Sequence, residues 1–171
     1  MKRKIILGLI SFLIIGLLIP QNFSVPVKDA SKADFNQNSF WHYPWGKSGT
    51  HKGVDIFAKK GTDVLASTSG IVLFAGEIEI GGKVIIILGP KWRIHYYAHL
   101  DNIQASLGFI SRNEKIGTVG DTGNAVGKQP HLHYAIVTLL PYLWQIDTAP
   151  QGWKKMFYLN PVTLINKDLT N

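Results

Sequence analysis

Two histidines one residue apart are the first candidates for chemistry in this chain. His131 and His133 lie in the segment PHLHYAI, at the start of an apolar run that is typical of a β-strand. Residues i and i+2 of a strand point to the same face, roughly 6–7 Å apart. Both imidazoles can therefore reach one small volume, where one ring could bind a metal and the other could stand beside the metal's open position.

A second pair of candidate ligands, His51 and Asp55, lies in the segment THKGVDIFA. A helix would stack these two side chains, but Gly53 and the β-branched Val54 and Ile56 disfavour a helix here. On a straight strand the two residues would lie roughly 13 Å apart, too far to share an ion through bonds of about 2 Å. We therefore expect the chain to turn between them, at Gly53, which permits such a turn.

These groups together predict a metal site. His51, Asp55 and one histidine of the 131/133 pair would supply three nitrogen and oxygen ligands and leave a fourth position for water, as in catalytic zinc sites. Zinc is the expected ion, although the ligand types alone also admit iron or manganese.

The segment IHYYAHL adds a further histidine. Strand alternation predicts that His95, Tyr97 and His99 share one face. We expect His99 to face the site as a hydrogen-bond donor. His95 is interpreted as a sheet-face residue, and Tyr97 as a packed strand residue in preference to a catalytic one.

The elements that must position these residues are short β-rich runs separated by glycine-containing turns. Their spacing of roughly 8–15 residues, without long helical periods, predicts a mostly β single domain with an antiparallel β-sheet core. A chain of 171 residues with 46% hydrophobic residues suits one such domain. We expect the domain to span residues 39–165, after a polar tether at residues 21–38 and before a C-terminal tail at residues 166–171.

An aromatic excursion at about residues 139–158 interrupts the carboxyl end of this domain. It carries Trp144 and Trp153, and one short helix is expected after Pro150. The excursion could wall a groove or dock a partner, but ordinary packing of the two tryptophans is the preferred interpretation. We expect the chain to return to the sheet at NPVTLI.

The amino terminus reads as an export signal. Lys2, Arg3 and Lys4 precede an uncharged stretch at residues 5–20. Its length falls between the roughly 7–15 apolar residues of a cleaved signal peptide and the roughly 20 of a spanning helix. The lack of a nearby Ala-x-Ala site favours an uncleaved membrane anchor, with the domain exported to the periplasm or cell envelope.

Composition excludes several other classes. Three of the seven net positive charges belong to the amino terminus and the rest are dispersed, so we expect no nucleic-acid partner. The absence of cysteine excludes disulfides, thiolate nucleophiles and cysteine-based zinc sites. The sequence contains no His-Glu-x-x-His, Gly-x-Ser-x-Gly or phosphate-binding Gly-x-x-x-x-Gly-Lys motif.

Four segments, HKGVDIFAKKGTDVLASTSGIVLFAG, YYAHLDNI, KIGTVGDTGNAVGKQPHLHYAI and LNPVTLI, resemble the lysostaphin/LytM-type zinc metalloendopeptidase family of peptidoglycan hydrolases. The resemblance covers residues 40–138 continuously and returns at residues 159–165. It implies one zinc per chain bound by His51, Asp55 and His133, with His131 and His99 as catalytic residues. It also implies an antiparallel sheet with a substrate groove, and peptide stems or bridges of peptidoglycan as the substrate.

Two other functions stay open on the sequence alone. A non-enzymatic envelope protein of the same fold could bind wall peptides or activate another wall hydrolase, but such a protein is expected to have lost ligands. A metallopeptidase acting on a protein outside the wall would use the same site and differ only in its groove. A regulatory protein partner, the bond cut and the oligomeric state are not indicated.

Overall fold

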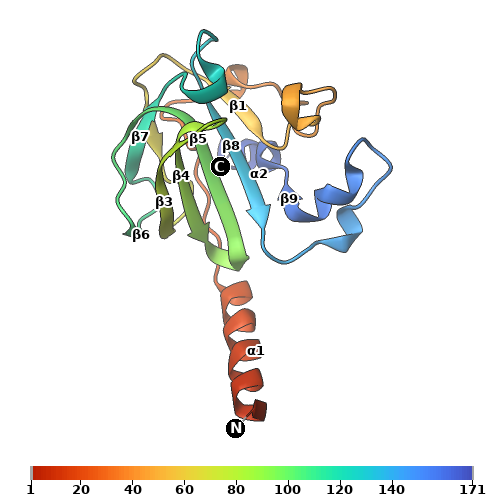
Figure 1. Cartoon of the computed structure of the whole chain (residues 1–171). Helices are drawn as coiled ribbons and strands as arrows, with labels where there is room; N and C mark the ends of the chain where they lie inside the picture. Colours follow the sequence, from red (N-terminus) through yellow and green to blue (C-terminus); the bar gives the residue numbers. More distant parts are fainter. Residues whose placement is uncertain (1, 171) are drawn as a thin grey trace.

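The fold is mostly β, as the sequence predicts. The computed structural model describes residues 2–170, and these contain one antiparallel sheet of nine strands with few helices (Figure 1). The strands are β1 (Val54–Phe57), β2 (Asp63–Leu65), β3 (Gly70–Ile78), β4 (Gly82–Gly89), β5 (Arg93–Ile103), β6 (Gly108–Ile110), β7 (Lys115–Val119), β8 (His131–Thr138) and β9 (Tyr158–Leu159).

The order of the strands brings together segments that are far apart in the sequence. The main path of the sheet is β1-β8-β5-β4-β3-β6, while β7 pairs with both β2 and β5, and β9 pairs with β8. Strand β8 therefore lies between β1 and β5, so that the three segments singled out by their histidines are immediate neighbours.

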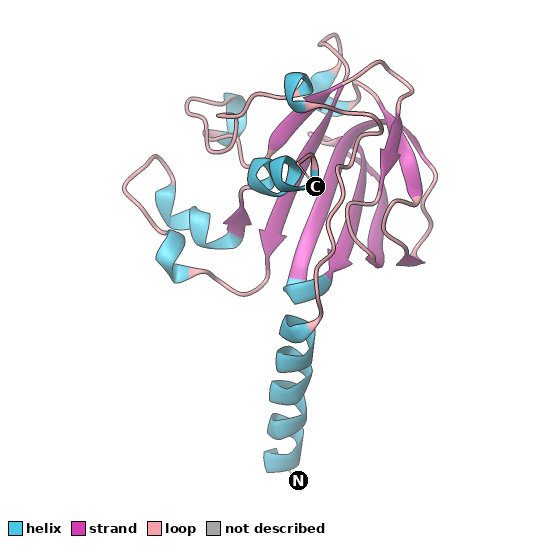
Figure 2. Ribbon diagram, turned by 180° about the vertical axis from the view of Figure 1, so that it is seen from behind, coloured by secondary structure: helices cyan, strands magenta, loops and turns pink. Residues whose placement is uncertain are grey.

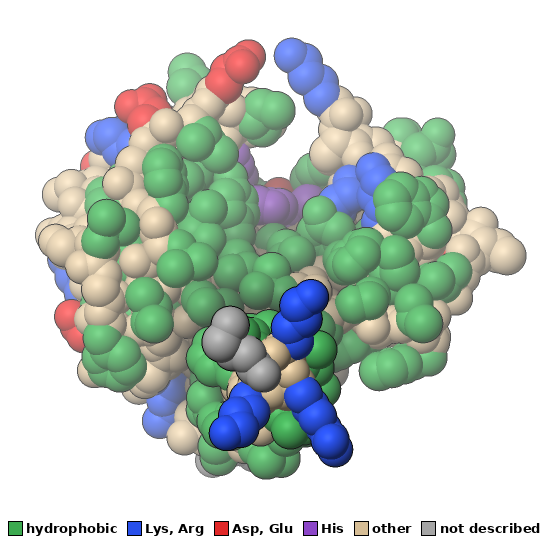
Figure 3. All heavy atoms as spheres, turned by 60° about the horizontal axis from the view of Figure 1, so that its bottom comes forward, with side chains coloured by type: hydrophobic (Ala, Val, Ile, Leu, Met, Phe, Trp, Pro, Cys, Tyr) green, Lys and Arg blue, Asp and Glu red, His purple; other side chains and the backbone are tan. Residues whose placement is uncertain are grey.

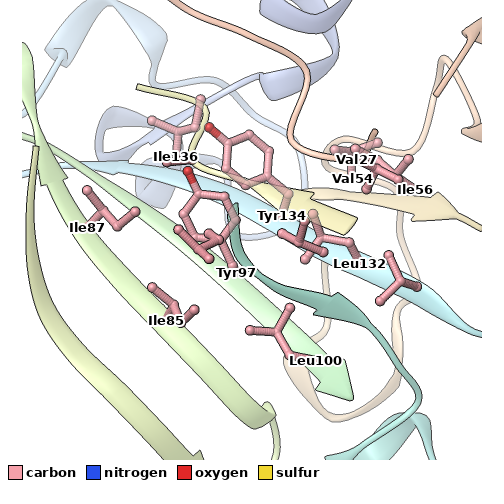
Figure 4. Close-up of a cluster of buried hydrophobic side chains, with 14 of the residues drawn as sticks. Val27, Val54, Ile56, Ile85, Ile87, Tyr97, Leu100, Leu132, Tyr134 and Ile136 are labelled. Carbon is pink, nitrogen blue, oxygen red and sulfur yellow. The ribbon is translucent and has the colours of Figure 1, made fainter. Parts of the chain in front are cut away.

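The core lies on one face of these central strands. Leu132, Tyr134 and Ile136 of β8 are fully buried there, whereas His131 and His133 alternate with them on the opposite face. Strands β1, β4 and β5 contribute the facing side chains (Figure 4). Because side chains of a strand alternate between its two faces, the apolar residues that fix the register of β8 also fix the direction of its histidines.

The segment at residues 21–38 is not the loose polar tether that we expected. Val27 and Phe35 are 2% and 5% exposed and belong to the hydrophobic core. They form β-bridges to Val64 and Ile56, and the backbone of Ser24 also bonds to the sheet domain. Phe23 and Val25 also pack against the core. We call residues 21–38 the N-terminal strap, because these apolar side chains hold it on the domain despite its polar composition.

Helix α2 (Pro161–Asp168) corrects the expected carboxyl end. The segment NPVTLI was expected to rejoin the sheet, but β9 makes that return and α2 begins directly after it. Asn160 caps the helix by accepting a hydrogen bond from the Val162 backbone N–H at 3.0 Å. Asp168, in the expected tail, accepts a hydrogen bond from the strap at Val25 N, and both segments lie on the face seen in Figure 2.

Helix α1 (Lys2–Leu18) projects from the domain and exposes its apolar residues (Figure 1). Between residues 2 and 170, the structure contains no helix that is both long and apolar enough to cross a membrane.

The aromatic excursion folds into short 3₁₀ turns, η5 (Leu143–Gln145) and η6 (Gly152–Phe157). The preferred interpretation of its tryptophans as packed residues is wrong, because Trp144 and Trp153 are 79% and 56% exposed. The excursion instead supports the loop before β1. Trp41 Nε1 donates to the Pro150 carbonyl at 3.0 Å, and Gln151 Nε2 donates to the Ser48 carbonyl at 2.9 Å.

Candidate metal centre

Three side-chain atoms converge on one point beside β1 and β8. His133 Nδ1 lies 2.7 Å from Asp55 Oδ1, and His51 Nε2 lies 3.1 Å from both of them. Ligand atoms of a tetrahedral zinc, at bond lengths of about 2.0 Å, lie a little over 3 Å apart. The set has the spacing and the donor atoms of a three-ligand metal site.

Strand register places two of these residues. Asp55 of β1 stands directly opposite His133 of β8, and Ala98 of β5 is the partner of His133 on its other side. Residues directly opposite on antiparallel strands have Cβ atoms about 4.5–5.5 Å apart, so Asp55 and His133 meet without any distortion of the chain.

His51 reaches the same point because the chain bends at Gly53, as expected. The reason for the glycine differs from the expectation, however, because its φ is not in the left-handed region. A Cβ at this position would collide with the Tyr134 carbonyl oxygen and press on the His133 ring at 3.0 Å. Gly53 is therefore needed for the close approach of the bend to β8.

The His51 ring is held on two sides. Its Nδ1 donates to the Ser39 carbonyl at 3.0 Å, which leaves the lone pair of Nε2 directed at Asp55 and His133. The indole of Trp45 stacks on the ring, with the ring centroids 4.2 Å apart. No sequence pattern marks Trp45 as part of the site, because only the fold of the loop before β1 brings it onto His51.

The chemistry of the donor set fits a cation. In the neutral His51 ring the lone pair of Nε2 faces the Asp55 oxygen, so this contact is favourable only when a ring proton or a metal cation lies between the two atoms. Burial alone would raise the pKa of Asp55, but the adjacent His133 and His51 rings outweigh it and hold that pKa well below its usual range. The carboxylate is therefore ionised, as a metal ligand must be.

His99 and His131 stand next to this set. Their ring centroids are 5.1 Å apart, and that of His99 is 6.0 Å from that of His133. Each Nδ1 donates to a backbone carbonyl, from His99 to Thr122 at 2.9 Å and from His131 to Gln129 at 2.8 Å. Both rings therefore have Nε2 free for other partners. Burial, with the His133 and His131 rings beside it, lowers the pKa of His99 to about 4.

The expected sharing of one face by His95, Tyr97 and His99 is wrong for His99. His95 and Tyr97 are fully buried, and Tyr97 packs in the core as the sequence favours. At Ala98 and His99 the register with β4 shifts, and His99 takes a φ of +64°. This bulge turns His99 to the face of the histidine cluster, where Tyr96 rather than Tyr97 accompanies it.

The cluster borders a cavity of about 580 Å³. Figure 3 shows histidine side chains at the bottom of a hollow between two lobes of the molecule. The lining includes His99, His133, Tyr96, Trp45, Lys47, Glu79 and Asn124. The structure thus brings all five sequence-predicted residues to one cluster. The exposed His42 adds no ring to this cluster; its carbonyl accepts a hydrogen bond from His51 N at 3.0 Å, and its ring centroid lies 6.0 Å from that of Trp45.

The chain is also similar in sequence to curated peptidases. The chain is 32% identical to the L-Ala--D-Glu endopeptidase of Bacillus subtilis over 149 residues, which are 80% of this chain and 44% of that protein. The chain spans less than half the length of the curated relatives that it matches.

Two solved structures share the fold. The catalytic domain of lysostaphin from Staphylococcus simulans is 32% identical, with a TM-score of 0.54 over 58% of this chain and 76% of that one. A zinc-containing peptidase from Vibrio cholerae is 28% identical, with a TM-score of 0.56 over 67% of this chain and 36% of that one. Residues 49–142, more than half of the chain, match Peptidase family M23. The match begins just before His51 and ends just after β8, so it contains the whole histidine cluster, and the chain belongs to peptidase family M23.

Proposed function

We propose that this protein is a zinc-dependent endopeptidase that hydrolyses peptide cross-links of bacterial peptidoglycan. The convergence of His51, Asp55 and His133 beside two further histidines carries the proposal. Family membership and the similarity to an L-Ala--D-Glu endopeptidase and to lysostaphin support the substrate class. A non-enzymatic relative is disfavoured because the ligand set is complete.

The three converging residues would hold the zinc through His51 Nε2, Asp55 Oδ1 and His133 Nδ1. Bound zinc lowers the pKa of a coordinated water and polarises a peptide carbonyl. The Ser39 carbonyl and the Trp45 indole keep His51 in the tautomer and orientation that this binding needs.

The two outer histidines differ in role. His131, with Nδ1 committed to the Gln129 carbonyl, accepts the proton of the attacking water at Nε2 and passes it to the leaving amine. His99 is neutral at pH 7, because its pKa is low. Its Nδ1 hydrogen is committed to Thr122, so its Nε2 can only accept. It therefore orients the water by accepting a hydrogen bond, and does not act as the hydrogen-bond donor expected from the sequence.

With peptidoglycan as its substrate, the protein would act outside the cytoplasm, in the periplasm or cell envelope. The basic and apolar amino terminus is consistent with this location as an export signal.

The first experiment measures zinc content and wall digestion on the same samples of the full chain. Zinc is measured by mass spectrometry, and released wall peptides are counted for the native protein and for His133→Ala. We expect one zinc per native chain, and loss of both zinc and peptide release in His133→Ala. Lys32→Ala, which changes an exposed residue of the N-terminal strap, should retain both.

Each other outcome changes the conclusion. A native chain that neither holds nor takes up zinc contradicts the catalytic proposal and leaves a wall-binding or regulatory protein of the same fold. A zinc-loaded chain that cuts a panel of unfolded proteins but not purified wall contradicts the substrate class while retaining the peptidase chemistry.

A further inference from the structure

Helix α1 meets the domain at one end, through contacts with η3 (Pro90–Trp92). Trp92 Nε1 donates to the Leu13 carbonyl at 2.9 Å, and its ring lies 4.9 Å from that of Phe12. Lys91 Nζ donates to the Leu17 carbonyl at 3.0 Å, at the last turn of the helix. The end of α1 and the adjoining part of the domain therefore form one continuous surface.

Exposed apolar side chains lie on both sides of this junction. Ile71 and Phe109, 50% and 74% exposed, line a cavity of about 450 Å³ together with α1 and η3. On the other side, Leu139, Leu143 and Trp144 are 55%, 63% and 79% exposed. We define the apolar collar as Ile71, Trp92, Phe109, Leu139, Leu143 and Trp144.

Hydrogen bonds and stacking tie the excursion side of the collar to the junction. Leu139 N donates to the Trp92 carbonyl at 3.0 Å. Arg93 Nη2 donates to the Tyr142 hydroxyl at 3.3 Å, and the Tyr142 ring stacks on Trp144 at 5.0 Å. Viewed from the α1 side, hydrophobic side chains face the reader on both lobes around the helix (Figure 3). An exposed apolar surface of this extent indicates an interaction site.

The form of α1 identifies lipid as the occupant. All residues of the helix except Gly16 are exposed, with Ile5 at 57% and Leu18 at 73%, so apolar side chains surround it. A groove on a protein covers one face of a helix, whereas lipid covers every face. Tryptophan and tyrosine beside lysine and arginine are typical of the boundary between lipid and water.

Charge agrees with this assignment. Basic side chains lie at both ends of α1, with Lys2, Arg3 and Lys4 at its start and Lys91 at its last turn. Such groups can remain among anionic headgroups while the apolar residues between them are covered by lipid.

We propose that the apolar collar is a lipid-docking surface, on which the domain itself rests against a membrane around α1. Turn η4 (Gly123–Ala125), part of which lines the site cavity, lies at the opposite end of the molecule from α1 (Figure 1). Docking through the collar therefore leaves the η4 end of the site cavity far from the lipid. The proposal does not depend on catalysis.

The test uses single cysteines, because the native chain has none. Leu143→Cys, Phe109→Cys and Val126→Cys are each made in the full chain and labelled with an environment-sensitive fluorophore. Val126, 74% exposed and next to η4, is the matched control. On vesicles of phosphatidylethanolamine and phosphatidylglycerol with nitroxide-bearing headgroups, we expect blue-shifted, quenched emission at positions 143 and 109 and unchanged emission at position 126.

A second variant tests whether the two sides of the collar act together. Leu143→Ser with Trp144→Ser, labelled at position 109, should stay on the vesicles through α1 but lose the quenching at position 109. Labels at 143 and 109 that remain as water-exposed as the label at 126 overturn the proposal. Quenching at 109 that survives the double substitution overturns the assignment of the excursion to the docking surface.

Discussion

At the residue scale, His95 is a fully buried titratable group outside the histidine cluster. Its Nδ1 lies 2.6 Å from the Tyr134 hydroxyl, and its Nε2 lies 3.1 Å from Gln21 Nε2. Burial, with the Arg93 guanidinium nearby, lowers the pKa of His95 to about 3. The unfolded histidine, with a pKa near 6.5, takes up a proton first, so stability is lost as pH falls below about 6.5. Between pH 7 and pH 5 we expect the titration of His95 to lower the free energy of unfolding by about 2 kcal/mol, measured by denaturant unfolding.

His95→Gln provides the comparison, since it removes the titration and keeps a polar group beside Tyr134. Its stability should fall less between pH 7 and pH 5 than that of the native chain, with the remaining fall due to groups such as His99. Equal losses in the native chain and His95→Gln would show that His95 is not the source.

Spacing predicted which residues would gather, but not every contact between them. His131 and His133 were predictable because a strand of alternating period must point both to one face. The contact of Trp45 with His51 was not predictable, because it depends on the path of a loop. Nor was the position of His99 beside Tyr96, because it depends on a bulge that no residue type marks. A non-glycine φ of +64° at His99 is visible only in three dimensions.

At the element scale, the approach of the Gly53 bend to β8 decides the geometry of the metal centre. In Gly53→Ala, the added Cβ meets the Tyr134 carbonyl and the His133 ring, so the bend must move away from β8. We expect weaker zinc retention in a chelator competition, because His51 and Asp55 move relative to His133. A lower midpoint of thermal unfolding should accompany it.

The matched control is Gly8→Ala in α1, where an added Cβ meets nothing within 4 Å. It should keep native zinc retention and native stability of the domain. Native zinc retention in Gly53→Ala would mean that the loop carrying His51 adapts freely, and that the close approach is not what sets the site.

Glycine-bounded apolar runs predicted the longer strands, because both period and length mark them. They did not predict β6 and β9, which have three and two residues and depend on pairing with β3 and β8. The N-terminal strap was missed for a related reason. Its apolar residues Phe23, Val25 and Val27 alternate over only five positions that include Pro26, and Phe35 stands apart from them, so the pattern is too short and too interrupted to mark a strand.

At the scale of the whole molecule, the N-terminal strap joins α1 to a domain that it also helps to build. Phe35 is 5% exposed and bridges to Ile56, next to the candidate ligand Asp55. Truncation of a buried phenylalanine typically costs roughly 3–5 kcal/mol through lost burial and the cavity left behind. We expect Phe35→Ala in the full chain to lower the free energy of unfolding by roughly 3–5 kcal/mol, measured by denaturant unfolding.

Lys32→Ala, at an exposed position of the same strap, should change the free energy of unfolding by less than about 0.5 kcal/mol. A similarly small loss of stability in Phe35→Ala would show that the strap contributes little to the core and acts as a tether, as the sequence predicted.

The outcome bears on how α1 is mechanically connected to the site. A strap held in the core at Val27 and Phe35 limits how far α1 can move relative to β1 and Asp55. A loose tether would let the domain turn freely around α1 and would weaken any fixed docking of the apolar collar.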